Sequence, residues 1–298
     1  MVALATAARA RAGRVAGLIE AWQEADDLIE HWERAIAHAP DDAPGFESNL
    51  SDVLADERIE EIVDLIVGEA EHGVSLVTVL DEGYPRNLRT IEGRPPFLWI
   101  RGHVAALAWQ RAVAIVGTRQ ASAGARTLAH AMSMQIASSG VAVLSGLALG
   151  VDTEAHEGAL AAGGKTMAVM GTGTSMVYPR QNERLAEQIV ESGGALVSQF
   201  MPDATGRRWS FPMRNAVMSG MALGTLVIEA SETSGAKLQA RIALQQGRRL
   251  LLAEPLVESE AWARRYAERR GAITVSTAGD VVRALQSADP PPPQLALC

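Results

Sequence analysis

The segment from Ala112 to Leu160 constrains the fold of this chain more than any other part of it. One apolar run, Ala112 to Val116, ends on a Gly-Thr-Arg turn, and a second, Val141 to Leu144, ends on a Ser-Gly turn. Each turn leads into a stretch with the apolar spacing of a helix, so the pattern is strand, glycine turn and helix, repeated once. Strands joined in this way lie parallel, and their carboxyl ends share the sheet edge at which open α/β proteins bind ligands.

Later apolar runs extend the same pattern, and two of the four also end in turns rich in Gly or Ser. They cover Thr166 to Met170, Ala195 to Ser198, Thr225 to Glu229 and Arg248 to Ala253. We therefore predict an α/β fold with an extended Rossmann-like, doubly wound and mostly parallel sheet. Two runs before the first repeat, Val74 to Leu80 and Phe97 to Ile100, are expected to add strands at the edge of the sheet.

The 298 residues divide into three predicted regions. Residues 1–72 form an acidic helical region, and residues 73–258 form the Rossmann-like domain with its lead-in strands. Residues 259–298 form a short extension of helix and strand that ends in a Pro-rich tail. The N-terminal helices have two interpretations, a cap on the main domain or a docking element for a partner protein.

The charge of the chain is unevenly distributed between these regions. The net charge is −8, but residues 1–72 carry 17 Asp and Glu against 5 Lys and Arg, and the remaining residues carry 18 against 22. The acidity is thus confined to the N-terminal region, and the main domain is mildly basic. This asymmetry is compatible with a polyanionic partner for the main domain.

Several classes of protein and site are disfavoured by composition. The only cysteine is Cys298, so no disulfide forms within the chain, and no uncharged apolar run approaches the roughly 18 residues of a membrane span. We expect a cytoplasmic protein without membrane contact. The six His residues show no metal-ligand spacing, and the G-x-G-x-x-G motif is absent. No metal and no cofactor are therefore predicted.

The two turns in the opening segment contain candidate functional residues. Gly117, Thr118 and Arg119 are typical either of a phosphate-binding turn or of a structural turn with a solvated Arg. Asp152 and His156 are four residues apart on a helix and could form an acid–base pair, but no recognisable nucleophile accompanies them. Asp152 is better explained as an acceptor for free N–H groups. We predict no catalytic residues.

The segment from Arg207 to Asn215 combines three Arg with Trp209 and Phe211. Cations and aromatic rings in one loop are typical of single-stranded nucleic acid binding, in which Arg contacts phosphates and rings stack on bases. The alternative is a loop whose aromatic side chains are buried and whose Arg side chains are solvated.

A series of motifs in unbroken order resembles the DNA-processing protein A (Smf) family, whose members bind single-stranded DNA. The resemblance spans about Val74 to Pro255. Its motifs are Val77-Thr78-Val79-Leu80-Asp81 with Tyr84-Pro85, Gly117-Thr118-Arg119 with Ser122 and Gly124, Ser145-Gly146-Leu147-Ala148 with Gly150 and Asp152, Ala155-His156, Gly158-Ala159-Leu160, Tyr178-Pro179, Phe211-Pro212 with Arg214-Asn215, and Glu229-Ala230 with Ser234-Gly235.

The resemblance implies a protein that binds single-stranded DNA in a basic pocket without turning it over. It also implies a homodimer, a RecA-type recombinase as partner, and a role in DNA recombination and natural transformation. Direct DNA contacts are implied for Arg119, Arg208 and Phe211. The complete predicted DNA-binding set is Gly117, Thr118, Arg119, Ser145, Gly146, Arg208, Phe211, Arg214, Asn215, Ser234 and Gly235.

The chain departs from the family pattern at several positions. The family's Arg-Asn-Arg reads Arg214-Asn215-Ala216, its Ser-Glu reads Ser198-Gln199, and its Ser-Gly-Ser-Leu reads Ser234-Gly235-Ala236-Lys237. We also expect no C-terminal winged helix after Leu285. The chain is therefore identified as a divergent member.

An alternative function on the same fold is a small-nucleotide sensor or a hydrolase that releases the base from a nucleotide. Related hydrolases carry a catalytic Glu just after the Gly-rich turn. In this chain the corresponding segment, Ser234 to Gln239, contains no carboxylate.

Overall fold

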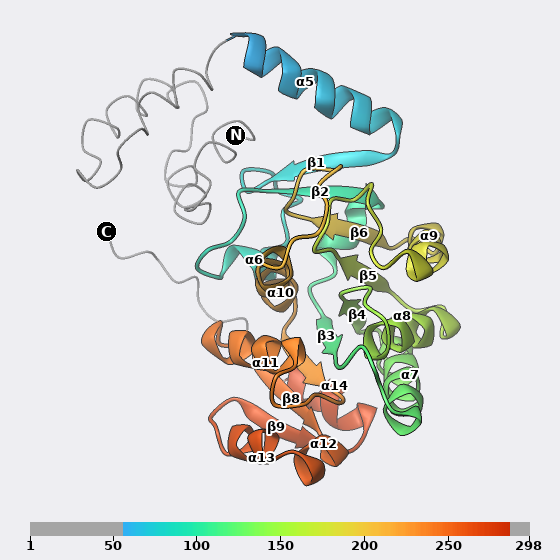
Figure 1. The fold of residues 1–298 in the computed structure, drawn as a ribbon, viewed down its shortest axis with the longest axis vertical. Helices are drawn as coiled ribbons and strands as arrows, with labels where there is room; N and C mark the ends of the chain where they lie inside the picture. The colour runs from blue at the N-terminus through green and yellow to red at the C-terminus, as the bar shows by residue number, and fades with distance from the viewer. Residues whose placement is uncertain (1–55, 287–298) are drawn as a thin grey trace, which may run out of the picture.

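Nine strands form one sheet in the computed structural model, which describes residues 56–286 (Figure 1). Their order across the sheet is β1-β2-β6-β5-β4-β3-β7-β8-β9. The strands are β1 (Val74–Thr78), β2 (Phe97–Gly102), β3 (Ala112–Val116), β4 (Ala142–Ser145), β5 (Thr166–Val169), β6 (Ala195–Ser198), β7 (Gly224–Val227), β8 (Arg249–Ala253) and β9 (Ala272–Val275).

The sheet is parallel from β6 to β9, whereas β1 and β2 are antiparallel and occupy one edge. The chain starts the parallel part at β3, proceeds outward to β6, and then returns to place β7 on the other side of β3. The strand order therefore reverses between β3 and β7, the position at which doubly wound sheets bind ligands. The predicted fold class and the edge strands are confirmed.

Helices cover both faces of the sheet. α7 (Ala123–Ser138), α8 (Val151–Ala161) and α9 (Glu183–Glu191) lie along one face, and α10 (Ser210–Met221) and α11 (Gly235–Gln245) lie along the other (Figure 1). After residue 72, the remaining helices are α6 (Arg86–Arg89), α12 (Glu254–Ser259), α13 (Ala261–Ala267), α14 (Ala278–Gln286) and the short 3-10 turns Val104–Ala108 and Arg180–Asn182. Within residues 56–286, no helix combines the length and the apolarity that crossing a membrane requires.

The part of the N-terminal region that the structure describes is the helix α5 (Asp56–Glu71). Ile62, Leu65 and Ile66 of α5 pack against a buried cluster of Val74, Phe97 and Trp99 on the edge strands. This contact fits the interpretation of a helical cap. The predictions for residues 1–55 and for the Pro-rich tail lie outside the described residues.

The residues after 258 complete the sheet and its core. β9 pairs in parallel with β8, and Trp262 of α13 is fully buried. The Trp262 indole N–H donates to the carbonyl of Ala230, just beyond β7, at 2.9 Å. Trp262, Val281 and Leu285 belong to the same buried cluster as β3 and β7. We therefore expect residues 259–286 to unfold together with the rest of the domain.

Trp262→Ala tests this expectation. Removing a fully buried indole leaves a cavity in the shared core and a carbonyl without its donor, so the free energy of unfolding should fall by about 3–5 kcal/mol. Urea denaturation monitored by circular dichroism measures the change. Trp209→Ala is the matched control, because Trp209 is 58% exposed, and it should change stability by no more than about 0.5 kcal/mol. If Trp262→Ala instead shows a separate unfolding transition at low urea concentration, residues 259–286 do not unfold together with the rest of the domain.

Candidate nucleic-acid interface

A cavity of about 310 Å³ opens at the carboxyl ends of β3 and β7, where the strand order reverses. Eight of the eleven residues predicted to bind DNA line it. The lining consists of Val116, Gly117, Thr118, Arg119, Ala148, Asp152, Phe211, Arg214, Asn215, Met218, Ser231, Ser234, Gly235, Ala236 and Gln239. The cavity therefore joins the turn after β3, the start of α8, the helix α10 and the start of α11.

The turn after β3 is held by close backbone packing. A Cβ atom on Gly117 would lie 2.4 Å from Cγ2 of Val151 and 2.9 Å from the carbonyl oxygen of Glu229, so only glycine fits between α8 and the end of β7. The Thr118 N–H donates to the Glu229 carbonyl at 2.7 Å, and the Ser122 N–H donates to the Glu229 carboxylate at 2.9 Å. This packing fixes the backbone from which Arg119 projects.

Arg119 is an exposed cation beside an aromatic ring. Its guanidinium carbon lies 5.5 Å from the centre of the Phe211 ring, and that ring lies 6.0 Å from the ring of Tyr178. Phe211 packs over Gly171, where a Cβ atom would lie 2.6 Å from the ring. Arg119 makes no hydrogen bond or ion pair with any other residue between 56 and 286. Its guanidinium is thus available to an anion.

Arg214 has a different role, because it is buried beneath the cavity. Its guanidinium donates to the Val169 carbonyl at 2.8 Å and to the Asn215 side-chain oxygen at 3.0 Å. A Cβ atom on Gly146 would lie 1.8 Å from that guanidinium, so the lack of a side chain there makes room for it. Burial lowers the pKa of Arg214, whereas the attraction of Asp152 raises it.

Asp152 binds the turn that precedes its own helix. One carboxylate oxygen accepts the N–H groups of Gly146, at 3.1 Å, and Ala148, at 3.4 Å. Burial raises the pKa of Asp152, and the positive charge of Arg214 opposes that rise. Asp152 accepts N–H groups as predicted, but these belong to the glycine turn and not to the first turn of α8.

His156 is not paired with Asp152. Its Nδ1 lies 2.7 Å from the hydroxyl oxygen of Thr166, and that hydroxyl donates to the Val143 carbonyl at 2.9 Å. Since the hydroxyl proton is used there, Nδ1 of His156 must be the donor to Thr166. Burial is the main cause that lowers the pKa of His156, to about 3, so the ring is neutral at physiological pH. The structure gives Asp152 and His156 separate contacts.

The turn after β4 has an unusual backbone, which is supported by a side chain from just before α9. Leu147 is fully buried with a φ angle of 57°, a conformation that residues other than glycine rarely adopt. The side-chain amide of Asn182 donates to the Leu147 carbonyl and to the Thr153 hydroxyl, each at 2.9 Å. Sequence reasoning missed Asn182, because no local pattern links it to a turn 35 residues earlier.

Three predicted site residues lie outside the cavity lining. The Ser145 hydroxyl is buried and donates to the Ile115 carbonyl at 2.6 Å, and Gly146 supports Arg214 from below. Arg208 is exposed on the loop before α10 and makes no hydrogen bond or ion pair within the described residues. Ser145 and Gly146 therefore support the site structurally, and Arg208 is free to contact a ligand beyond the cavity.

Exposed aromatic and apolar side chains are present on the segments next to the cavity. Trp209 is 58% exposed and lies edge-on to Phe200, and Tyr178 is 52% exposed. Met176 and Met213 are also exposed. The sequence placed Tyr178 only within a family motif, because exposure cannot be read from a single aromatic residue in a loop.

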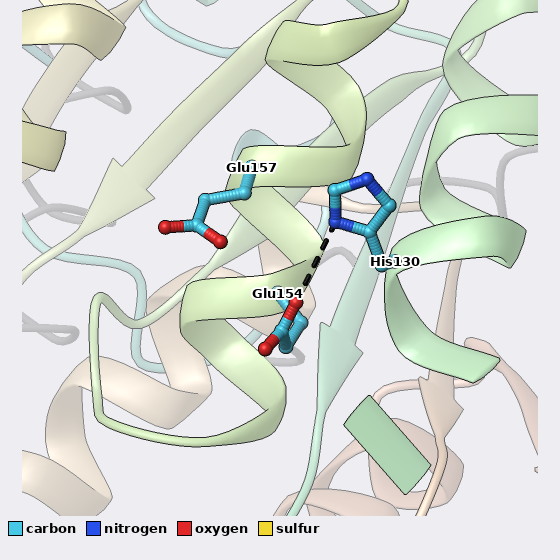
Figure 2. Close-up of side chains that lie close together, drawn as sticks. All are labelled: His130, Glu154 and Glu157. Carbon is cyan, nitrogen blue, oxygen red and sulfur yellow. Dashed lines mark ion pairs between the residues drawn. The ribbon is translucent and has the colours of Figure 1, made fainter. Parts of the chain in front are cut away.

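One group of side chains within residues 56–286 has the composition of a metal site, although the sequence predicted none. His130 of α7 faces Glu154 and Glu157 of α8, and their ligand atoms all lie within 4.8 Å of one another (Figure 2). His130 Nδ1 lies 3.5 Å from the Glu154 carboxylate. Burial and the nearby charge of Glu154 raise the pKa of Glu157. None of the three residues lines the cavity, and the ion pair joins α7 to α8.

Comparison with known proteins shows which family and which fold this chain resembles. The model of the family described as DNA recombination-mediator protein A matches residues 75–286. Protein Smf of Escherichia coli is 36% identical over 213 residues, which are 71% of this chain and 56% of that protein. DNA processing protein DprA of Bacillus subtilis is 33% identical over 178 residues, which are 60% of each chain. This chain thus spans little more than half the length of these curated relatives.

Solved structures show the same fold. DNA processing protein A of Streptococcus pneumoniae superposes with a TM-score of 0.68 at 28% identity, covering 81% of this chain and 83% of that one. DNA processing protein A of Helicobacter pylori, described for its single-stranded DNA binding mode, superposes with a TM-score of 0.63 at 22% identity. That match covers 72% of this chain and 95% of the Helicobacter protein.

Gly146→Ala tests the buried arrangement beneath the cavity. The added methyl group would overlap the Arg214 guanidinium, which must then leave the Val169 carbonyl, so the free energy of unfolding should fall by about 2 kcal/mol or more. Gly124→Ala is the matched control, because no atom lies within 4 Å of its added Cβ. Gly124→Ala, which lies in the helix α7, should raise the free energy of unfolding by about 0.4–1 kcal/mol. Equal stability of the two variants in urea denaturation would contradict the tight packing.

Proposed function

The chain belongs to the DNA recombination-mediator protein A family, and on this basis we propose that it binds single-stranded DNA as a recombination mediator. The observation that carries the proposal is the position of Arg119. This exposed cation has no hydrogen-bond or ion-pair partner among the described residues, and it stands over the Phe211 ring at a cavity of the strand-end edge. A cation for phosphate and a ring for a base are thus adjacent, as binding of single strands requires.

Further groups at the cavity favour an anion. Ser234, Gly235 and Ala236 lie at the start of the helix α11 and line the cavity, so the positive end of the helix dipole points toward it. The guanidinium of Arg214 also lines the cavity, with the carboxylate of Asp152 as its counter-charge. Arg208 supplies a second exposed guanidinium beyond the cavity. These groups support a path for successive phosphates.

One half-buried and two exposed rings support the binding of bases. Phe211 and Tyr178 are in ring contact beside Arg119, and Trp209 presents its ring on the adjoining loop. Stacking a base on such rings contributes about 1–3 kcal/mol and does not depend on the sequence of the strand. We therefore propose that DNA lies across the cavity and the loop before α10, with Arg119, Arg208 and Phe211 as direct contacts.

We propose binding without turnover. Asp152 is the single carboxylate among the lining residues, and one of its oxygens already accepts two backbone N–H groups. His156 is buried and bonded to Thr166. Neither residue is positioned as a free acid or base for a bound ligand. Release of a base from nucleoside monophosphates would contradict this part of the proposal and favour the hydrolase alternative.

The cellular role is proposed from family membership. We expect a homodimer in the cytoplasm that delivers single-stranded DNA to a RecA-type recombinase, in recombination and natural transformation. The single-stranded DNA binding mode described for the Helicobacter pylori protein supports the choice of ligand. Docking of a partner protein by the acidic N-terminal region is a separate prediction.

Arg119→Ala tests the proposal in a salt series. Fluorescence anisotropy of a labelled oligo-dT should show tight binding that weakens steeply with salt, because phosphate contacts release counterions. Loss of one phosphate contact should weaken binding and reduce the slope of log K against log salt by about 0.7. Arg208→Ala should act in the same direction.

Arg111→Ala is the matched control for charge. Arg111 is an exposed residue immediately before β3, at the opposite end of the strand from Arg119. Arg111→Ala changes the net charge by the same amount as Arg119→Ala. It should leave the DNA affinity, and the slope of log K against log salt, close to those of the unmodified protein. Equal losses in both variants, or binding that does not respond to salt, would overturn the assignment of this edge.

A further inference from the structure

Gln239 is the one lining residue whose side chain is buried with its polar atoms unpartnered. It is 1% exposed, and neither its amide oxygen nor its amide nitrogen has a hydrogen-bond partner among residues 56–286. Arg214 and Asp152, the other strongly polar buried residues of the lining, both make hydrogen bonds. Buried polar side chains are almost always hydrogen-bonded, so an orphaned amide at a cavity indicates a group that a ligand completes.

Gln239 lies close to the start of α11, where the helix dipole favours an anion. Gly235 begins α11, and Gln239 follows it by four residues, so the two lie on the same face of the helix about one turn apart. A phosphate held at the start of α11 would therefore place the adjoining part of its molecule toward Gln239. The cavity, at about 310 Å³, falls at the small end of the range for small-molecule sites, about 300–1,000 Å³.

The side-chain amide of Gln239 determines which chemical group of a ligand can bind to it. Gln239 offers one acceptor oxygen and one donor nitrogen side by side. Each of the four DNA bases presents an adjacent donor and acceptor on its Watson–Crick edge, and unpaired bases are read at that edge. The terminal torsion of Gln is broad and roughly two-fold, so the amide can turn over to match either order of donor and acceptor. A buried amide of this kind fits any base.

We propose that the cavity takes up one nucleotide unit, its phosphate at the start of α11 and its base hydrogen-bonded to the side-chain amide of Gln239. The proposal rests on the proposed function and adds to it that binding needs a base in the cavity but does not depend on which base. The nucleotide unit can belong to a strand of DNA or be a free mononucleotide, and the two sources are distinguished by experiment.

The test compares Gln239→Met with the unmodified full-length protein. Methionine is unbranched and similar in size to Gln, but it lacks the amide. Anisotropy is measured with labelled 12-mers of dT, dA and dC and with a 12-mer of abasic sites. The unmodified protein should bind the three base-bearing strands alike and the abasic strand about tenfold more weakly. Gln239→Met should bind dT about tenfold more weakly, with little further loss on the abasic strand.

Two variants control for indirect effects. Gln245→Met makes the same substitution at an exposed position of α11 and should bind like the unmodified protein. Gln239→Glu preserves the shape but removes the donor, and it should also weaken binding to dT. Thermal melting by circular dichroism verifies that the variants fold. If Gln239→Met and Gln239→Glu discriminate base-bearing from abasic strands as the unmodified protein does, the inference is overturned while DNA binding stands.

The source of the nucleotide is decided by isothermal titration with thymidine monophosphate. Binding of the strands without measurable binding of the mononucleotide supports a unit held within DNA. Binding of the mononucleotide that Gln239→Met abolishes, with no binding of any strand, supports the same site for a free nucleotide and contradicts the proposed function. Binding of neither by the unmodified protein overturns both proposals.

Discussion

The burial of the Arg214 guanidinium against the bare backbone of Gly146 is the contact on which the rest of the site depends. Arg214 comes from α10, the helix with which the chain crosses back over the sheet, and it bonds the carbonyl at the end of β5. Asp152 holds the N–H of Gly146 and attracts the buried cation. One guanidinium thus joins the crossover helix α10 to the end of β5 and to the turn after β4. The guanidinium of Arg214 and the carboxylate of Asp152 both line the cavity.

The buried Arg214 and the exposed Arg119 have different roles in this arrangement. Arg214 lines the cavity, but its guanidinium is buried and already donates to the Val169 carbonyl, so its main role is to hold the backbone around the cavity. The exposed Arg119 supplies the direct contact, on a turn that Gly117 allows to pack closely between neighbouring elements. The net charge of −8 for the whole chain therefore gives little information about this edge, since the excess of acidic over basic residues lies in the N-terminal region. Local placement of charge, and not the total, determines what the edge can bind.

The sequence was sufficient for most strands of the sheet and for the edge where the cavity lies, because apolar runs that end in glycine turns constrain the backbone strongly. The predicted β3 and β6 coincide with those in the structure, and most predicted site residues line the cavity. The extent to which each side chain is buried was not predictable from the sequence. Ser145 and Gly146 lie behind the cavity lining, and Gln239 is buried within it. Periodicity in the sequence indicates which face of a helix or strand a residue lies on, but not what covers that face. The contact of Asn182 with Leu147 joins segments far apart in the chain, and a single sequence carries no signal for it.

Photo-crosslinking tests whether single-stranded DNA lies on the strand-end edge at β3 and β7, the placement on which the proposed function depends. A 12-mer containing 5-bromodeoxyuridine would be irradiated with the full-length protein, and the crosslinked peptides would be identified by mass spectrometry. We expect crosslinks at the aromatic residues beside the cavity, Tyr178, Trp209 and Phe211, and their competition by unlabelled oligo-dT. Competed crosslinks found instead on the antiparallel edge formed by β1 and β2, with none beside the cavity, would contradict this placement.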